Sequence, residues 1–268
     1  MDNPEWTSEG IDVERPSTAR IYDYLLGGCH NFAADREIAR QAIAFIPDLP
    51  LQAQANRAFM RRAVVHLAAQ GVHQFLDIGS GVPTVGNVHE IAQQQDPDAR
   101  VVYVDIDPIA VAHSKEILAG DPRTAVIEAD LRHPDRILAH PDLKAVLDLD
   151  KPVGLLLVAV VHFIHDDDEA ARVLGQLREA LAPGSYLVMA HGSHEGRPEL
   201  VEKLAQLTAR TTTPFKPRSK AQVRRLFDGF ELIEPGIVWV PEWRPDTAED
   251  VDDHPEYANN YGGVGRKA

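Results

Sequence analysis

The amino-acid sequence predicts an α/β fold built on a doubly wound, mostly parallel sheet. From residue 74 onward, short apolar runs alternate with segments of helical length. The runs are continuously apolar, which is typical of strands buried on both faces. Repeated strand–helix units have right-handed crossovers that place helices on both faces of a sheet. The five runs are Phe75–Ile78, Val101–Val104, Ala125–Ala129, Val153–Val161 and Tyr186–Ala190.

Helices are expected between and after these strands. The clearest covers Asp167–Leu181, whose apolar residues, among them Leu174 and Leu177, share one face at helical spacing. The loop Thr211–Arg218 is expected to be the most mobile segment, because it holds three threonines and two prolines. The other helices are expected over Thr84–Gln95, Pro108–Ala119, a broken segment at Pro134–Leu147, Pro198–Thr208, and from a capping box at Ser219 to Gly229.

Three helices are expected before the first strand. Pro16 marks the beginning of the first helix and Gly27 marks its end. In the third, apolar residues recur every four positions and form one face. We therefore expect residues 1–70 to form a helical cap and residues 71–268 to form the ligand-binding domain. The second and third helices are expected over Asp35–Phe45 and Leu51–Gln70.

The composition excludes several classes of function. A formal net charge of −14 over 268 residues disfavours broad attraction to nucleic acid and suits a small or cationic substrate. Met1–Arg15 is polar and lacks the apolar region of a signal peptide, and Val153–Val161 is about half the length of a membrane span. A single cysteine, Cys29, excludes an intramolecular disulfide and a multi-cysteine metal site. We expect a cytoplasmic protein without a membrane segment or a metal.

A glycine loop follows the first strand. Asp77 ends the strand, and Gly79 and Gly81 allow a tight turn and a close approach to a ligand. A dinucleotide fingerprint needs a third glycine where Thr84 stands, and Pro83 removes an amide that a pyrophosphate would use. The loop therefore favours a ligand without a pyrophosphate, although two glycines are also compatible with a merely tight turn.

Carboxylates end the second and third strands. Asp105 stands where the hydroxyls of a ribose can be held, while Asp107, before a proline, is more typical of a helix N-cap. After the third strand, the side chain of Asp130 can accept a hydrogen bond from an adenine amino group, and Leu131 can pack on the ring. Together with the glycine loop, these residues predict a nucleoside site at the carboxyl edge of the sheet.

These features resemble the class I S-adenosylmethionine-dependent methyltransferases. More narrowly, the sequence is similar to an actinobacterial S-adenosyl methyltransferase family. The narrower family also carries Pro-Thr where the general class has the end of a Gly-x-Gly-x-Gly pattern. The stretches that carry the resemblance are Pro16–Gly28, Asn31–Arg36, Asp77–Thr84, Gly86–Glu90, Val102–Asp105 and Tyr261–Lys267.

The resemblance implies a Rossmann-like, seven-stranded sheet whose last strand is antiparallel. Phe230–Val240 and Tyr261–Lys267 would be strands six and seven, and the N-terminal helices would close over the cofactor, S-adenosyl-L-methionine. It names no methyl acceptor. The candidate cofactor-binding residues are Tyr22, Asn31, Asp77, Gly79, Ser80, Gly81, Asp105, Ile106, Asp130, Leu131 and Val160.

The N-terminal segment Pro16–Arg36 is expected to belong to the active site. Its polar residues, such as Asn31 and Asp35, make it too polar for a simple pair of buried helices, and its glycine pair could serve as a hinge. The alternative is a helical cap that only shields the sheet.

Histidines at the strand ends are the candidates for acid–base chemistry. His162 follows the fourth strand and His191 follows the fifth, and a histidine can act as a general base near neutral pH. A purely structural role is the more common explanation for each. Methyl transfer is an in-line displacement that depends mainly on orientation, so a base is needed only for some acceptors.

The sequence thus predicts a methyltransferase that acts on a small molecule. The main alternative is a regulatory protein that binds S-adenosyl-L-methionine without catalysis. A dehydrogenase is disfavoured by the missing third glycine at Thr84. The oligomeric state is left open.

Overall fold

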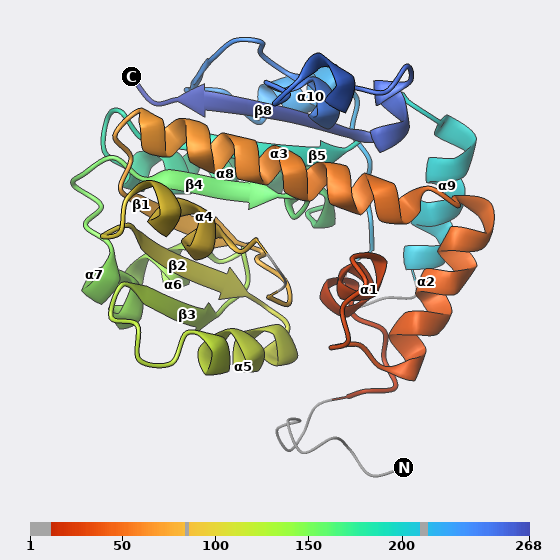
Figure 1. Cartoon of the computed structure of the whole chain (residues 1–268), viewed down its shortest axis with the longest axis horizontal. Coiled ribbons are helices and arrows are strands. Elements are labelled where there is room, and N and C mark those ends of the chain that lie inside the picture. The colour runs from red at the N-terminus through yellow and green to blue at the C-terminus, as the bar shows by residue number, and fades with distance from the viewer. Residues whose placement is uncertain (1–11, 84–85, 210–213) are drawn as a thin grey trace.

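The computed structural model describes residues 12–83, 86–209 and 214–268. They form a single mixed sheet in the order β3-β2-β1-β4-β5-β8-β6, with β7 also paired to β8 (Figure 1). The first five strands are mutually parallel, which confirms the predicted α/β fold. The strands are β1 (Gln74–Ile78), β2 (Arg100–Asp105), β3 (Thr124–Glu128), β4 (Gly154–Val158), β5 (Tyr186–Gly192), β6 (Glu231–Leu232), β7 (Val238–Trp239) and β8 (Asn260–Arg266).

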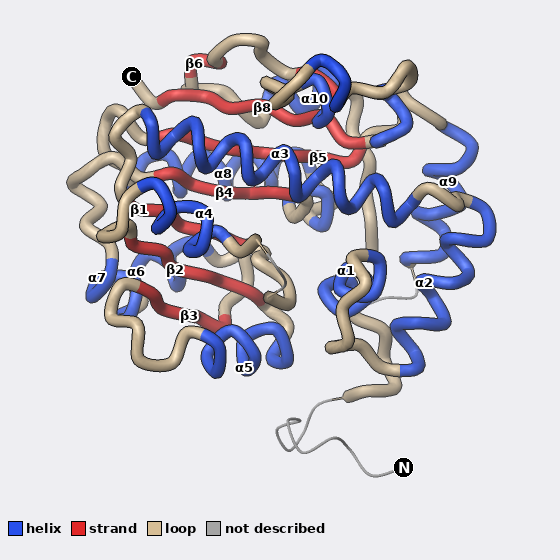
Figure 2. Tube along the Cα trace, viewed as in Figure 1, coloured by secondary structure: helices blue, strands red, loops and turns tan. Residues whose placement is uncertain are grey.

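Helices cover both faces of the sheet, as a doubly wound fold requires (Figure 2). Neighbouring residues of a strand point to opposite faces, so Phe75 belongs to the core under α3 and α4, whereas Leu76 belongs to the core under α6, α7 and α8. The helices are α1 (Thr18–Leu25), α2 (Ala33–Phe45), α3 (Leu49–Ala69), α4 (Val88–Gln95), α5 (Pro108–Ile117), α6 (Pro134–Ala139), α7 (Pro141–Val146), α8 (Asp167–Ala180), α9 (Pro198–Thr208) and α10 (Lys220–Arg225).

Helix α3 connects the cap to the sheet. Its predicted apolar face is present, since Phe59, Ala63 and Leu67 are fully buried against the sheet. Its first turn, with Leu49 and Ala53, packs instead with α1 and α2 in a separate apolar cluster. The predicted boundary at residue 70 therefore lies just after a helix that packs both in the cap and against the sheet.

The last part of the sheet differs in detail from the two strands expected there. The expected sixth strand, Phe230–Val240, is divided by the turn at Pro235-Gly236 into the two short strands β6 and β7, so the sheet has eight strands. The last strand, β8, is antiparallel as expected, and it lies between β5 and β6. Residues 84–85 and 210–213 are outside the described residues, and the second of these segments includes the first part of the loop Thr211–Arg218, which was expected to be mobile.

The cap lies beyond the carboxyl ends of the parallel strands. Figure 1 shows the arrowheads of β2, β3 and β4 pointing toward the side where α1, α2 and α9 gather. Gly27, with φ +81°, ends α1 as predicted. The cap core unites α1, α2 and the first turn of α3, with side chains of α9 packed against it. This arrangement encloses the edge of the sheet where ligands bind in open α/β folds.

Candidate functional site

A cavity of about 810 Å³ lies between the cap and the carboxyl edge of the sheet. Such a volume is at the upper end of the usual range for small-molecule sites. Ten of the eleven predicted cofactor-binding residues line it, and Asn31 does not. The ten are Tyr22, Asp77, Gly79, Ser80, Gly81, Asp105, Ile106, Asp130, Leu131 and Val160.

The glycine loop has the conformation that its sequence predicts. Gly79 has φ +77° and Gly81 has φ +69°, in the left-handed region that favours glycine. A Cβ atom on Gly79 would lie 2.4 Å from a methyl carbon of Val160. Only glycine therefore permits both the turn and the contact between the loops that follow β1 and β4.

Asp105 fixes the glycine loop to the end of β2. One carboxylate oxygen accepts a 2.7 Å hydrogen bond from the Gly81 N–H, and the other accepts a 2.8 Å bond from the Asp107 N–H. A carboxylate has about four acceptor positions, so capacity remains for ligand hydroxyls. Burial raises the pKa of Asp105 to about 6, although these amide hydrogen bonds oppose the shift.

Asp107 is the N-cap of α5, as predicted. Its side chain accepts hydrogen bonds from the N–H groups of Ile109 at 2.9 Å and Ala110 at 3.2 Å. Its other oxygen forms an ion pair with Arg20, a residue of α1, at 3.2 Å. The cap is thus linked directly to the loop that follows β2.

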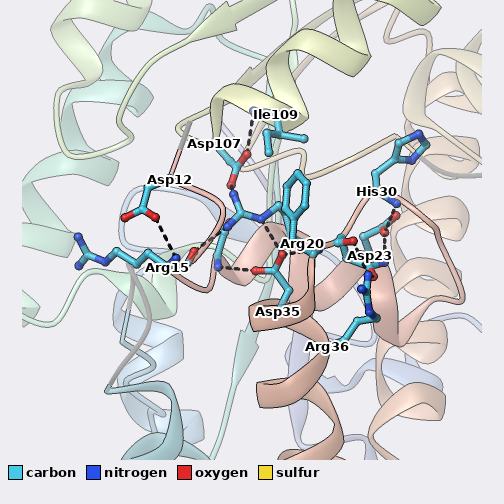
Figure 3. Close-up of polar contacts among 12 residues, drawn as sticks. Asp12, Arg15, Arg20, Asp23, His30, Asp35, Arg36, Asp107 and Ile109 are labelled. Carbon is cyan, nitrogen blue, oxygen red and sulfur yellow. Dashed lines mark hydrogen bonds and ion pairs between the residues drawn. The ribbon is translucent and has the colours of Figure 1, made fainter. Parts of the chain in front are cut away.

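Arg20 is the centre of this link, which Figure 3 shows. Its side chain is nearly fully buried and bonds Asp35 of α2 at 2.8 Å, besides Asp107 and the carbonyl of Arg15. Asp35 also accepts backbone hydrogen bonds from Ser17 and from Phe32. One cation therefore joins the first two helices to the sheet edge.

Asp77 is a second buried carboxyl in the cavity wall. Burial raises its pKa to about 7; Arg57 of α3 opposes this shift, and the nearby Asp105 reinforces it. Near neutral pH, the Asp77 carboxyl therefore has a large protonated fraction. Its proton lets two acidic side chains share one part of the wall with less repulsion.

The loops after β2 and β3 supply apolar surface and a third acid. The side chain of Ile106 is 48% exposed beside the cavity, and Leu131 is buried in the opposite loop. Burial raises the pKa of Asp130, but hydrogen bonds from Arg132 outweigh that effect and leave it below its ordinary value. Asp130 is therefore an ionised acceptor at neutral pH.

The two predicted residues of the N-terminal segment have different positions. Tyr22 lines the cavity, and its hydroxyl donates to the Ala53 carbonyl at 3.0 Å and accepts from Asn56 at 3.1 Å. Asn31 lies in the turn after α1, where its amide donates to Asp23 at 2.8 Å. Its polar atoms are engaged within the cap, so any effect on a ligand would be indirect.

The two candidate histidines also differ. His162 lines the cavity, and its Nδ1 accepts a 3.3 Å hydrogen bond from the Gly192 N–H. His191 is fully buried outside the cavity wall: Nδ1 donates to the Gly192 carbonyl, and Nε2 accepts from Arg218 at 2.9 Å. Burial and Arg218 lower the pKa of His191 to about 3, and burial holds the pKa of His162 well below its usual range. Both rings are neutral, and His191 has no free ring nitrogen.

Arg20 and Arg218 were not predicted from the sequence. Arg218 is 1% exposed and bonds Asp167, His191 and the carbonyl of Ile164, so it fixes the loop after β4. A buried arginine has no local sequence signal, because its partners come from distant segments. Arg20, however, lies in the stretch that carries the family resemblance, which was the available clue.

The chemistry of the wall fits an adenosyl sulfonium ligand. Asp105 offers acceptors for ribose hydroxyls, and Gly79 allows the glycine loop to pack directly against Val160. Ile106 and Leu131 present apolar surface for a purine ring, with the ionised Asp130 beside them. The wall thus contains both acceptors and apolar groups, the two kinds of surface that bind a nucleoside.

Comparisons with known proteins agree with this chemistry. A family model described as S-adenosyl methyltransferase matches residues 4–268. A Thermobifida fusca YX protein assigned as a methyltransferase is 44% identical, with 98% of this chain and 99% of that chain covered and a TM-score of 0.92. A DUF574 family protein from Streptomyces avermitilis MA-4680 is 45% identical, with coverages of 96% and 99% and a TM-score of 0.92.

More distant matches share the fold or a short segment. The N-methyltransferase NodS from Bradyrhizobium japonicum WM9, in complex with S-adenosyl-L-homocysteine, is 11% identical with a TM-score of 0.50, and the match covers 92% of this chain and 98% of that one. The ribosomal RNA small subunit methyltransferase H of Halorhodospira halophila is 40% identical over 63 residues. That match covers 24% of this chain and 19% of that relative, so this chain spans only a fifth of the relative's length.

Two kinds of feature are absent from the described part of the chain. In residues 12–83, 86–209 and 214–268, no helix has the length and apolar character needed to cross a membrane. The same residues contain no group of three or more acidic, histidine or cysteine side chains placed to hold a metal ion.

The family model covers nearly the whole sequence, and its cofactor, S-adenosyl-L-methionine, is the ligand that the carboxyl edge of the sheet fits. The chain belongs to the S-adenosyl methyltransferase family.

Proposed function

We propose that this protein transfers the methyl group of S-adenosyl-L-methionine to a small-molecule acceptor bound between the cap and the sheet. The observation that carries the proposal is the position of Asp105. Its carboxylate is oriented by two backbone N–H groups, one of them from the glycine loop, and it lines the same cavity as the other acids. We assign Asp105 to the ribose hydroxyls and Asp130, with Leu131 and Ile106, to the adenine.

The main work of the protein in this reaction is orientation. When bound, S-adenosyl-L-methionine supplies an electrophilic methyl group on a sulfonium. The cap residues hold the acceptor in line with that methyl group and exclude water, which favours displacement by the acceptor over hydrolysis. Tyr22 belongs to this wall, whereas Asn31 supports it from the turn behind α1.

We propose that His162 does not act as a general base. Its Nδ1 accepts from a backbone N–H, so the neutral ring carries its proton on Nε2 and is a donor. His162 would therefore orient an acceptor oxygen or nitrogen by donating to it. His191 has a structural role instead, because its Nε2 accepts a hydrogen bond from the buried Arg218.

The small size of the acceptor is inferred from charge and enclosure. A net charge of −14 disfavours RNA, and the cavity lies beneath the helices of the cap. The domain division that goes with this proposal is a cap formed by residues 1–70 and a cofactor-binding domain formed by residues 71–268. A protein that binds the cofactor without turnover is the second candidate.

Ligand binding tests the proposal. S-adenosyl-L-methionine and S-adenosyl-L-homocysteine should each raise the melting temperature, and saturation at 100 times Kd should stabilise the fold by about 2.7 kcal/mol. NAD and NADP should not. Stabilisation by NAD alone would overturn the assignment of the cofactor. Turnover separates an enzyme from a non-catalytic binding protein. An enzyme should release S-adenosyl-L-homocysteine when a pool of small acceptors is added, and should release none without the pool.

A further inference from the structure

The cavity continues from the sheet edge into the cap. Beyond the proposed cofactor residues, apolar side chains of α1, α2, α3 and α9 form its wall. Several of them belong to the apolar cluster of the cap, which is separate from the two cores that flank the sheet. We call this part the helical compartment; its apolar wall includes Leu25, Ile38, Ala42, Ala53, Val201 and Leu204.

Much of the wall of the helical compartment is uncharged. Among the described residues, every one that α2, α9 and the first two turns of α3 contribute to the wall is apolar or a neutral polar residue. The charged residues of the wall belong to the strand ends, to the segment before and within α1, and to Arg57 further along α3. Burial of an unpaired charge in such surroundings is costly, so this compartment rejects an ionised ligand.

Asn56 places an unused hydrogen-bond acceptor in this wall. Its side chain is 2% exposed, and its amide nitrogen donates to the Tyr22 hydroxyl at 3.1 Å. The Tyr22 hydroxyl donates its own proton to the Ala53 carbonyl, so it can only accept from Asn56. The amide nitrogen of Asn56, rather than its oxygen, must therefore face the hydroxyl. The oxygen Oδ1 of Asn56 then has no partner among the described residues. Buried polar atoms normally have a partner, and an unpaired one in a cavity wall points to a ligand.

Asn259 provides a second and independent unpaired amide. It is 6% exposed, lines the same cavity, and has partners for neither its side-chain oxygen nor its nitrogen within the described residues. It precedes β8 in a left-handed conformation with φ +52°, which asparagine adopts more readily than most residues. Buried amide atoms without a partner, in a residue of the cavity wall, again point to a ligand.

We infer that the helical compartment binds the methyl acceptor, and that this acceptor is an uncharged, largely apolar molecule with a hydroxyl or amine hydrogen donated to Asn56 Oδ1. This inference rests on the proposed function, because it places the acceptor beside the proposed cofactor site. The apolar wall supplies affinity, and the carboxamides fix the orientation of the polar group.

Three related fluorescent probes test the chemistry of the compartment. N-phenyl-1-naphthylamine is uncharged, apolar and carries one N–H; its N-methyl derivative lacks that hydrogen; and 1-anilinonaphthalene-8-sulfonate adds a negative charge. Binding is measured by fluorescence in saturating S-adenosyl-L-homocysteine. The uncharged N–H probe should bind about three- to tenfold more tightly than the N-methyl probe, the range expected for one hydrogen bond. It should bind at least about tenfold more tightly than the sulfonate.

Two variants and a matched control variant locate the probe. Asn56→Ala should remove the difference between the N–H probe and the N-methyl probe, because the acceptor atom is lost. Leu204→Trp should fill the compartment and weaken both probes, whereas Gln206→Trp, on the exposed side of the same helix, should weaken neither. S-adenosyl-L-homocysteine affinity, measured by calorimetry, should be retained in all three variants and shows that each is folded.

The outcomes separate the inference from the proposed function. Equal affinity for the sulfonate, an unchanged N–H preference in Asn56→Ala, or competition between probe and S-adenosyl-L-homocysteine would each overturn the inference. Failure of the parent protein to bind S-adenosyl-L-homocysteine would instead overturn the proposed function, and the probe series can still be measured on the ligand-free protein. If Leu204→Trp does not fold, the Asn56→Ala comparison still decides the point.

Discussion

Asp105 has two roles in the structure, one toward the fold and one toward the proposed ligand. Its carboxylate accepts the N–H groups of Gly81 and Asp107, and it lines the cavity. The sequence predicted its place at the end of β2, but not that it also fixes the glycine loop. Loss of this side chain therefore affects both the ribose contacts and the shape of the loop.

We predict that Asp105→Ala weakens S-adenosyl-L-homocysteine binding at least tenfold, about 1.4 kcal/mol, because charged hydrogen bonds contribute about 1.5–3 kcal/mol. Isothermal titration calorimetry measures the change. Glu128→Ala is the matched control, since Glu128 pairs with Asp105 in the β2–β3 register but is exposed and outside the cavity wall. Equal affinities of Asp105→Ala and the parent, with the fold intact, would refute the assignment.

The raised pKa of Asp77 predicts a pH dependence of stability. The folded carboxyl has a pKa of about 7 and the unfolded one about 3.8, so between these values the unfolded state binds fewer protons. The free energy of unfolding therefore decreases as the pH rises through this window. About three pKa units at about 1.4 kcal/mol each give an upper limit of about 4 kcal/mol.

The Asp77→Asn variant tests this effect. Its amide cannot ionise, so its stability should decrease less than that of the parent between pH 5.5 and pH 8. Urea denaturation at each pH gives both slopes. Parallel slopes for parent and variant would contradict the raised pKa.

At the scale of elements, the link through Arg20 joins α1 and α2 to the loop after β2. Arg20 pairs with Asp35 and Asp107, and all three side chains are buried. Removal of one partner from a buried ion pair leaves an uncompensated charge and costs about 3–5 kcal/mol. This guanidinium therefore helps to hold the cap over the sheet edge, together with helix α3, which packs in both parts.

We predict that Arg20→Gln lowers the free energy of unfolding by about 3–5 kcal/mol and weakens S-adenosyl-L-homocysteine binding. Chemical denaturation and calorimetry measure the two effects. Arg40→Gln, an exposed arginine on α2, should change stability by no more than about 0.5 kcal/mol. A stability of Arg20→Gln equal to that of Arg40→Gln would show that the link does not hold the cap.

The elements themselves were largely predictable because their signals are local. Apolar runs predicted β1 to β5, and the spacing along α3 predicted its buried face. The division of Phe230–Val240 into β6 and β7 could be placed only roughly, because a turn and two short strands share one apolar stretch.

The roles of His162 and His191 could not be separated from the sequence, since both follow strands. His162 lines the cavity, whereas His191 lies outside the wall and accepts a hydrogen bond from Arg218. Arg218 comes from a distant segment, so the sequence does not show this pairing. The same reasoning applies to the unpaired oxygen of Asn56, because its lack of a partner is a property of the packed wall.

At the scale of the whole molecule, the cavity lies between the cap and the strand ends, which are joined by helix α3 and by the buried link through Arg20. The cap contributes one side and the strand ends contribute the other. A ligand that touches both parts stabilises them together, because opening of the cap would then require release of the ligand.

We predict that S-adenosyl-L-homocysteine slows amide hydrogen exchange in α1 and in residues 105–107 by up to about 100-fold at 100 times its Kd. Exchange in α10, which is outside the cavity wall, should be unaffected and serves as the internal control. Mass spectrometry of peptides resolves the three segments. Protection of residues 105–107 without protection of α1 would indicate a cap that only shields the sheet.

The place of β8 in the sheet has a consequence for how the protein is made. β8 follows all the other strands in sequence, yet it lies between β5 and the short strands β6 and β7. During translation, one edge of β5 has no neighbouring strand until β8 has been made, and an unpaired edge can associate with other strands. A nascent chain that stalls before β8 leaves that edge open, so the synthesis of β8, rather than that of the parallel strands, decides when this sheet is protected from aggregation.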